Sequence, residues 1–322
     1  MVAVVLPTFN EEGFIDACLR SLAVQDYPGR WEVVIADGGS TDATRQHIAE
    51  WQDRINLTLV DNPAQVQSEG LWLAATATDA EILVRADAHT TYASDYIRRS
   101  VEVLNETSAT AVGGPMAPDA PSAFGAAVAG MMRTPLGIGP GAFHHGGERR
   151  SVDTVYLGAF RRSDFLNLGG MRTLPSRVAE DADFYWRMRR AGGTVLLDPA
   201  IRSVYRPRET WPALWQQFFK YGRGKADMLL VNGVWPSWRP LAPLLLVLGL
   251  LGGVGLGLFG IWWPLAALTL VWMLALVVAA RGRPLCVVVA ATMHVSYGFG
   301  LLTGLARMPG RVRAQVVSRS AP

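Results

Sequence analysis

Two pairs of residues in this chain combine side-chain types that could bind a divalent cation or move a proton. Asp87 and His89 are one residue apart at the end of an apolar run, and Glu180 and Asp181 begin a segment with helical spacing. If the backbone stays extended through the first pair, both side chains point the same way and could face one ion. A carboxylate and an imidazole suit Mn2+ or Mg2+ when a nucleotide diphosphate supplies further oxygens. On spacing alone, a capping Asp87 and an exposed His89 are the better explanation.

The acidic segment offers one candidate general base. Carboxylates at a helix start are favoured by the helix dipole alone, so capping is the plain explanation of the segment. Asp181 and Asp183 would project from roughly opposite faces of a helix, so they cannot share one substrate. We therefore expect Asp181, which lies nearer the open end of the helix, to do any acid or base work.

Two polar turns near the amino terminus carry groups that can hold a nucleoside. The turn from Pro7 to Glu12 has a side-chain amide and carboxylates, and the turn from Asp37 to Asp42 has carboxylates, two glycines and small hydroxyls. Either turn alone is better explained by ordinary capping and turn preferences. Their occurrence in this order favours a pocket for a base and a ribose.

The elements that position these turns predict an α/β domain. The apolar runs Val2 to Leu6 and Val33 to Ala36 are β-branched and short, which is typical of strands covered on both faces. Helical spacing over 11–23 separates them, so the two strands should be parallel, with the polar turns at the edge where ligands bind. The alternation continues with a helix at 41–51, a strand at 56–60, a helix at 65–78 and a strand at 81–89. We predict a mostly parallel sheet.

The second half of the chain predicts a membrane region. Hydrophobic residues make up 50% of the 322 residues and charged residues only 18%, and the apolar excess follows Pro240. Soluble helices keep a polar face, but three runs there have none and approach the roughly 20 residues that a crossing needs. These candidate spans are 241–259, 262–280 and 285–305. We expect a catalytic domain at 1–208, an amphipathic interface segment at 209–239 and a transmembrane region at 240–322.

The distribution of charge gives conflicting indications about orientation. No leader precedes the first strand, so we expect a cytoplasmic catalytic domain on a multi-pass protein of the inner or plasma membrane. Arg239, Arg281 and Arg283 should then be cytoplasmic. A third full crossing would place the last arginines outside, against that rule: Arg307, Arg311, Arg313 and Arg319. Either the third run is re-entrant or interfacial, or the rule fails here.

Several function classes are excluded by what the sequence lacks. It has no glycine fingerprint for a dinucleotide and no Walker phosphate loop. Its basic residues gather just before the membrane region, where they can meet lipid headgroups or a diphosphate, so we expect no nucleic-acid partner. The segment from Trp211 to Lys225 mixes aromatic and polar residues like a helix lying among headgroups. Four of its residues could lean toward a diphosphate: Gln217, Tyr221, Arg223 and Lys225.

With these motifs in order, residues 1–230 resemble family 2 glycosyltransferases of the GT-A fold. The similarity is greatest to membrane-attached enzymes of succinoglycan-type exopolysaccharide synthesis. The motifs are Pro7-Thr-Phe-Asn-Glu-Glu12, Asp37-Gly-Gly-Ser-Thr-Asp42, Arg85-Ala-Asp-Ala-His89, Val112-Gly-Gly-Pro115, Glu180-Asp-Ala-Asp183 and Gln217-Phe-Phe-Lys-Tyr-Gly-Arg223.

The resemblance implies a role for each matching residue. Asp87 and His89 would bind the metal, and Asp181 would deprotonate the acceptor. Glu180 and the Gln217 to Arg223 segment, with Lys225 after it, would face the acceptor and the diphosphate. The donor would be held by Pro7, Thr8, Asn10, Glu11, Asp37, Gly38, Ser40, Arg85 and Asp87.

Two departures from the family pattern have consequences. Arg85 stands where the family often has a carboxylate, so the nucleoside must be held more by the first two turns. Lys220 stands in an arginine position and lacks the tryptophan next to it, so processive polymer synthesis is not expected.

The resemblance implies inverting, metal-dependent transfer of a hexose from a UDP-sugar to a hydroxyl of a polyprenyl-linked glycan at the cytoplasmic membrane face. One alternative is transfer to polyprenyl phosphate itself. Another, from a different class, is a non-catalytic membrane regulator that binds a nucleotide-sugar. The sugar, the linkage and the oligomeric state are not predicted.

Overall fold

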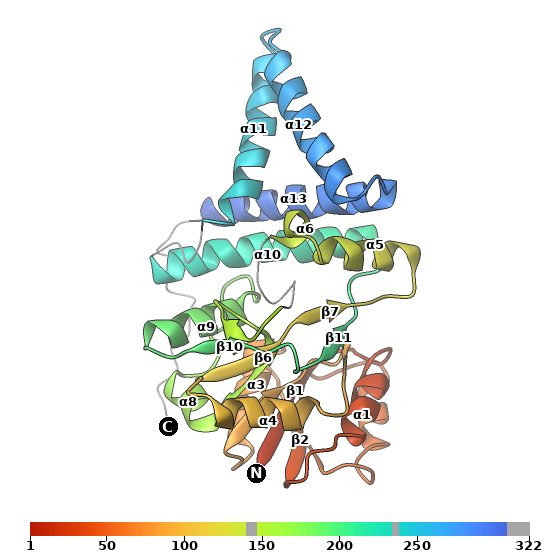
Figure 1. The fold of residues 1–322 in the computed structure, drawn as a ribbon, viewed down its shortest axis with the longest axis vertical. Coiled ribbons are helices and arrows are strands. Elements are labelled where there is room, and N and C mark those ends of the chain that lie inside the picture. Colours follow the sequence, from red (N-terminus) through yellow and green to blue (C-terminus); the bar gives the residue numbers. More distant parts are fainter. Residues whose placement is uncertain (140–146, 234–237, 308–322) are drawn as a thin grey trace.

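The protein consists of an α/β domain, a pair of long helices laid across it, and a helical hairpin that stands away from both (Figure 1). A computed structural model describes residues 1–139, 147–233 and 238–307. The pair consists of α10 (Trp211–Asn232) and α13 (Pro284–Leu305), and the hairpin of α11 (Leu241–Gly257) and α12 (Trp263–Ala279).

An eight-stranded sheet forms the centre of the α/β domain. Its strand order is β3-β2-β1-β4-β9-β6-β10-β8. The neighbours β3-β2, β2-β1, β1-β4 and β6-β10 are parallel, which confirms the mostly parallel prediction. The strand bounds are β1 (Val2–Thr8), β2 (Trp31–Asp37), β3 (Leu57–Asp61), β4 (Ile82–Arg85), β6 (Ala111–Gly114), β8 (Arg150–Ser151), β9 (Tyr156–Arg161) and β10 (Val195–Leu197). A smaller sheet pairs β5 (Thr90–Tyr92), β11 (Ser203–Tyr205) and β7 (Met116–Pro118) in that order.

Alternate residues of β1 separate two apolar cores. Val2, Val4 and Leu6 join one core with residues of three helices on that face, and Ala3 and Val5 join the other. The first core takes in α1 (Ile15–Ala23), α2 (Thr44–Ala49) and α4 (Tyr96–Glu106). The second takes in α3 (Gln67–Thr76), α8 (Arg162–Asn167) and α9 (Glu180–Arg190). Because both faces are covered, the central strands must be apolar throughout, as the sequence predicted.

The sheet register brings the predicted polar turns to one edge. Thr8 at the end of β1 pairs with Asp37 at the end of β2, and Val5 of β1 pairs with Arg85 at the end of β4. The strand that we predicted to extend to His89 is wrong at its end, because β4 stops at Arg85 and the chain then turns. The helix predicted from Glu11 begins four residues later, after a turn.

The three predicted apolar runs are helices of different length and surroundings. Only α13 among the described residues is both long and apolar enough to cross a membrane, whereas α11 and α12 have 17 residues each. Helix α13 lies along α10 (Figure 1). Their backbones touch through glycines, since a side chain on Gly222 would overlap the Tyr297 carbonyl oxygen and one on Gly300 that of Phe219. Of the four late arginines, Arg311, Arg313 and Arg319 fall outside the described residues.

Candidate active site

The two amino-terminal turns are joined to each other by reciprocal hydrogen bonds. The Asn10 side-chain oxygen accepts from the Thr41 amide at 2.9 Å, and the Asn10 amide donates to Ser40 Oγ at 2.9 Å. The Glu12 carboxylate likewise accepts from the Ala43 amide at 2.9 Å. The two turns therefore form one preformed wall at the carboxyl edge of β1 and β2.

Asp37 organises the second turn from inside. Its carboxylate is fully buried and accepts from the Gly39 and Ser40 amides, both at 3.1 Å, and from Ser40 Oγ at 2.6 Å. Thr8 Oγ1 donates to it at 3.4 Å, and the Arg45 guanidinium lies 3.3 Å away. Because these donors compensate the buried charge, the loop keeps its shape without a ligand.

The remaining predicted donor residues line the same wall. A Cβ on Gly38 would lie 3.1 Å from the ring of Phe9, and a Cβ on Gly70 would lie 3.1 Å from Pro7, so the backbone approaches closely at both places. The Glu11 amide donates to Thr44 Oγ1 at 2.7 Å. Its carboxylate points elsewhere, toward the tip of β4.

At that tip the chain turns between the two predicted metal ligands. Asp87 lies beside Arg85, whose Nη2 donates to its carboxylate at 3.3 Å, and Gln67 also donates at 3.3 Å. His89 sits in the turn, with Nδ1 3.5 Å from a carboxylate oxygen of Glu11. The extended backbone that would aim both side chains at one ion is absent here, because the turn begins directly after Asp87.

The donor set still fits a hard divalent cation that is shared with a substrate. Carboxylates from Asp87 and Glu11 and the imidazole of His89 are suitable ligand types for Mn2+ or Mg2+. Within the described ranges, no three His, Cys, Asp or Glu side chains converge as a complete metal site. An ion here would therefore need oxygens from a bound diphosphate.

Arg85 is a buried cation among the acidic residues. It is 4% exposed, and among the described residues its Nε has no hydrogen-bond partner. Burial alone would lower the pKa of the Arg85 guanidinium, but the charges of Asp87, Asp181 and Glu180 raise it instead. These carboxylates, from two segments nearly one hundred positions apart, thus surround one fixed positive charge.

Asp181 and Asp183 have different surroundings, as their helical spacing predicts. Asp183 is fully buried and receives bonds at 2.9 Å from Arg187 and at 3.0 Å from Asn232. Arg172 donates to both of its oxygens. Asp181 is half-buried at the start of α9, and its negative charge helps to raise the pKa of Arg85. Asp183 is committed to an ion-pair network, whereas Asp181 lies within electrostatic range of Arg85 and Lys225.

Glu180 is buried beside this group and is 7% exposed. Burial raises the pKa of Glu180 to about 7, the negative charge of Asp181 adds to the shift, and Arg85 opposes it. The resemblance placed Glu180 near the acceptor and diphosphate, and the structure buries it within electrostatic range of Arg85.

This shift predicts a stability that depends on pH. Between about pH 4.5 and 7, folded Glu180 keeps a proton that the unfolded chain releases. The free energy of unfolding that this protonation supports is therefore fully present below that range and is lost as the pH rises through it. We expect Glu180→Gln to stabilise the full-length protein in detergent more at about pH 8 than at about pH 5, by about 1.4 kcal/mol per unit of pKa shift. Thermal unfolding at the two pH values measures this, and an equal effect at both would contradict it.

Helix α10 presents one polar face toward the site. Gln217 donates to Tyr205 at 2.9 Å and to Tyr221 at 3.0 Å. Burial lowers the pKa of the half-buried Lys225, and the charge of Asp181 opposes this shift, so Lys225 lies within electrostatic range of the candidate base. Arg223 lies about 200° around the helix from Tyr221, on the side where α13 packs.

Tyr205 is a site residue that the sequence analysis missed. Its ring meets His89 edge-on, with centroids 5.5 Å apart, and its hydroxyl accepts from Gln217. It therefore connects the turn after β4 to α10. It comes from β11, in the small sheet, and no local pattern marks that strand as part of the site.

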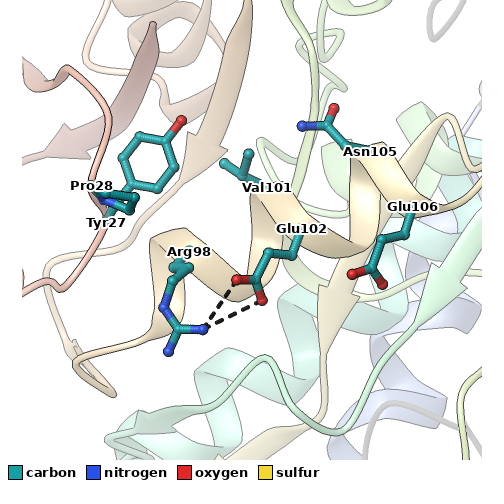
Figure 2. A pocket seen from close by; sticks show the side chains of 7 residues that line it. All are labelled: Tyr27, Pro28, Arg98, Val101, Glu102, Asn105 and Glu106. Atoms are coloured by element: carbon teal, nitrogen blue, oxygen red, sulfur yellow. Dashed lines mark hydrogen bonds and ion pairs between the residues drawn. The ribbon is translucent and has the colours of Figure 1, made fainter.

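Two surface hollows are lined by none of these residues. One lies between α4 and the loop at Tyr27 and Pro28 (Figure 2), and the other lies over α1. In the first, Arg98 pairs with Glu102 at 3.1 Å and also with Asp26. Because its charges are already paired, this hollow offers little to a nucleotide.

Comparison with known proteins agrees with the motif order. The family model described as Glycosyl transferase family 2 matches residues 3–166. The succinoglycan biosynthesis protein ExoA of Rhizobium meliloti is 31% identical over 309 residues, with 92% of each chain covered. A dolichyl N-acetylglucosaminyl phosphate glucuronosyltransferase of Methanococcus voltae is 24% identical, over 71% of this chain and 74% of that one.

Solved structures share the fold. A mannosyltransferase from Pyrobaculum calidifontis, in complex with GDP-mannose and Mn2+, superposes with a TM-score of 0.59 at 20% identity over 95% of this chain and 87% of that one. Residues 1–349 of TarS from S. aureus, in complex with UDP-GlcNAc, give 0.51 at 16% identity over 94% and 90%.

Proposed function

Because the chain belongs to glycosyl transferase family 2, we propose that it transfers a hexose from a UDP-sugar to a hydroxyl of a lipid-linked glycan, with inversion at the anomeric carbon. The reaction is metal-dependent and takes place at the cytoplasmic face of the inner or plasma membrane, to which a multi-pass helical region attaches the enzyme.

The observation that supports this proposal is the meeting of two unlike groups at one sheet edge. The wall from Asn10 to Ser40 presents amide and hydroxyl groups. Opposite it, Asp181 lies within electrostatic range of Arg85 and of Lys225 on α10. A nucleotide on the wall would direct its diphosphate toward Asp87 and its sugar toward Asp181.

In this mechanism each residue has a physical role. The wall orients the uridine, so that the anomeric carbon is held close to the acceptor hydroxyl. Asp181 accepts the hydroxyl proton while that oxygen attacks, and Lys225 and Arg85 supply fixed positive charge near the departing diphosphate. A divalent ion held by Asp87 and His89 together with the diphosphate would neutralise negative charge on the leaving group.

The partners are proposed from the named relatives. The neighbour TarS is described with UDP-GlcNAc, and the Methanococcus relative is named for a dolichyl-phosphate-linked acceptor. ExoA is named for succinoglycan biosynthesis, which supports a role in exopolysaccharide assembly. A polyprenyl-linked acceptor fits a site covered by a helix that adjoins the apolar region.

A donor panel tests the proposed reaction. Full-length protein would be incubated with native lipid extract, Mn2+ and radiolabelled UDP-hexoses, with GDP-mannose as the competing donor class. Label should enter the lipid fraction from one UDP-sugar, and UDP should be released in equal amount. Label transferred only from the GDP-sugar would overturn the donor assignment, and UDP binding without any release would indicate a regulator.

Replacing Asp87 with alanine tests the metal assignment. We expect UDP binding in Mn2+ to weaken at least tenfold, because the ion would be held jointly by this carboxylate and the diphosphate. Binding in EDTA should change little. Titration calorimetry with full-length protein measures both, and Asp53→Ala, in an exposed turn after α2, is the matched control. An unchanged affinity in Mn2+ would remove Asp87 from the ligand set.

A further inference from the structure

The hairpin of α11 and α12 exposes apolar side chains around most of its circumference. None of residues 240–280 carries a charge. On α12 only Leu276 is buried, and Val271 and Val278 are 67% and 77% exposed. The turn between the helices is still more open, with Leu258 at 79% and Phe259 at 84%. A surface of this kind needs an apolar environment on several sides at once.

Helix α13 is covered, although it is the longest apolar helix. Between Cys286 and Leu302 only Val288 is exposed. The glycine contacts described above press it against α10, and α10 rests on the α/β domain through buried Leu214 and Phe218. A helix enclosed in this way presents little side-chain surface to lipid.

A hydrogen bond and an ion pair also hold α13 and the chain just after it to α10. Trp211 Nε1, at the start of α10, donates to Thr292 Oγ1 at 3.0 Å in the first half of α13. At the other end Arg307 lies 3.2 Å from Asp227 of α10, a carboxylate that also accepts from the Ser176 amide at 2.7 Å in the loop before α9. Turning α13 upright across a bilayer would break all of these bonds.

The dimensions of the hairpin match a bilayer better than a protein partner. Each helix has 17 residues, so each rises about 26 Å, and the turn adds enough to reach across a hydrocarbon core of about 30 Å. Exposed Trp262 and Trp263 lie at the turn, while exposed Arg281 and Arg283 lie at the base. Tryptophan favours the membrane interfaces, and arginine favours the cytoplasmic one.

We infer that the α11–α12 hairpin is the part of the described chain that crosses the bilayer, with its turn at the far interface and with α13 lying in the plane of the membrane beside α10. Both ends of α13 are then on the side of the α/β domain. This arrangement rests on the membrane attachment proposed above and replaces three crossings by two. It also removes the charge conflict at Arg307, because the carboxyl end of α13 then lies on the cytoplasmic side.

Single-cysteine labelling tests this topology. In full-length protein with Cys18 and Cys286 changed to alanine, one cysteine would replace Phe259 in the turn, Ala306 after α13, or Gln52 in the α/β domain. A membrane-impermeant maleimide is added to right-side-out or inverted vesicles. We expect position 259 to react only in right-side-out vesicles, and positions 306 and 52 only in inverted ones.

The other outcomes each overturn part of the inference. Labelling of position 306 with position 259, from the outer side, would mean that α13 crosses. Labelling of position 259 from the inner side would mean that the hairpin lies outside the bilayer. If either position reacts only after detergent is added, it lies within the hydrocarbon, and the interfacial assignment is wrong.

A matched pair of arginine substitutions tests the lipid contact itself. Val271 in the hairpin and Val24 after α1 are 67% and 62% exposed. Because a charge is costly only within hydrocarbon, Val271→Arg should greatly reduce the fraction of chain that resists carbonate extraction, and Val24→Arg should leave it unchanged. Equal retention would contradict the inference. Glycosyl transfer by detergent-solubilised wild-type protein is measured separately, so a failed topology and a failed activity remain distinguishable.

Discussion

Replacing Asp181 with asparagine is expected to lower the rate of transfer by about 10²- to 10⁴-fold, which is the usual contribution of a positioned general base. Asparagine keeps the size of the side chain but cannot accept the proton of an attacking hydroxyl. Affinity for UDP should stay within about twofold of wild type, since the wall around Asp37 is untouched and one lost remote charge is screened. Single-turnover transfer and UDP titration measure the two quantities separately.

The same variant distinguishes the two acceptor chemistries. An acceptor hydroxyl must lose a proton, whereas a polyprenyl phosphate attacks with an oxygen that is already anionic. Asp181→Asn would therefore leave a lipid-phosphate transferase largely active. Substantial residual turnover with an intact donor site would reject Asp181 as the base and favour the phosphate acceptor.

Asp183 lies two residues further along α9. Replacing it with asparagine is expected to lower the stability of the folded protein, in contrast to Asp181→Asn, which should lower the rate of transfer. Burial alone would raise the pKa of Asp183, but Arg172 and Arg187 hold it below its ordinary value, so the carboxylate is charged in the folded protein. Removing it leaves two partly buried arginines without their partner, which typically costs about 3–5 kcal/mol. For a domain of this size, the midpoint of thermal unfolding should fall by roughly 10 °C.

The matched control is Asp153→Asn. Asp153 also lies between two arginines, at 2.8 Å from Arg189 and 3.6 Å from Arg239, but its side chain is 51% exposed. Surface pairs of this kind contribute about 0–1 kcal/mol. Thermal unfolding of the full-length protein in detergent compares them. If Asp183→Asn is no more destabilising than the control, the network around Asp183 is not structural, and its separation from the function of Asp181 is lost.

Sequence spacing alone explains only part of the difference between Asp181 and Asp183. Helical periodicity was sufficient to say that Asp181 and Asp183 face different ways. It could not identify the partners of Asp183, because Arg172 precedes α9 and Asn232 ends α10, about fifty residues later. Such partners are chosen by the packing of α10 over α9, and not by any local pattern.

The sequence by itself determined the first four strands, their parallel arrangement and the edge at which polar turns gather. These features depend on local periodicity and on the need to cover both faces of β1 and β2 with helices. For the same reason, the two amino-terminal motifs and the acidic motif at 180–183 could be placed on their correct elements before any fold was known. The turn after β4 was mispredicted because a run of apolar and polar letters does not specify where the backbone leaves the sheet.

The tertiary structure alone decided how the apolar helices are used. By length, 285–305 is the best candidate for a crossing, yet α13 is enclosed against α10, and the shorter α11 and α12 are the exposed pair. The sequence gives the length and the apolar character of a helix, but neither property distinguishes a helix buried in protein from one that faces lipid. Only the packing at Gly222 and Gly300, where two backbones approach closely, distinguishes one from the other.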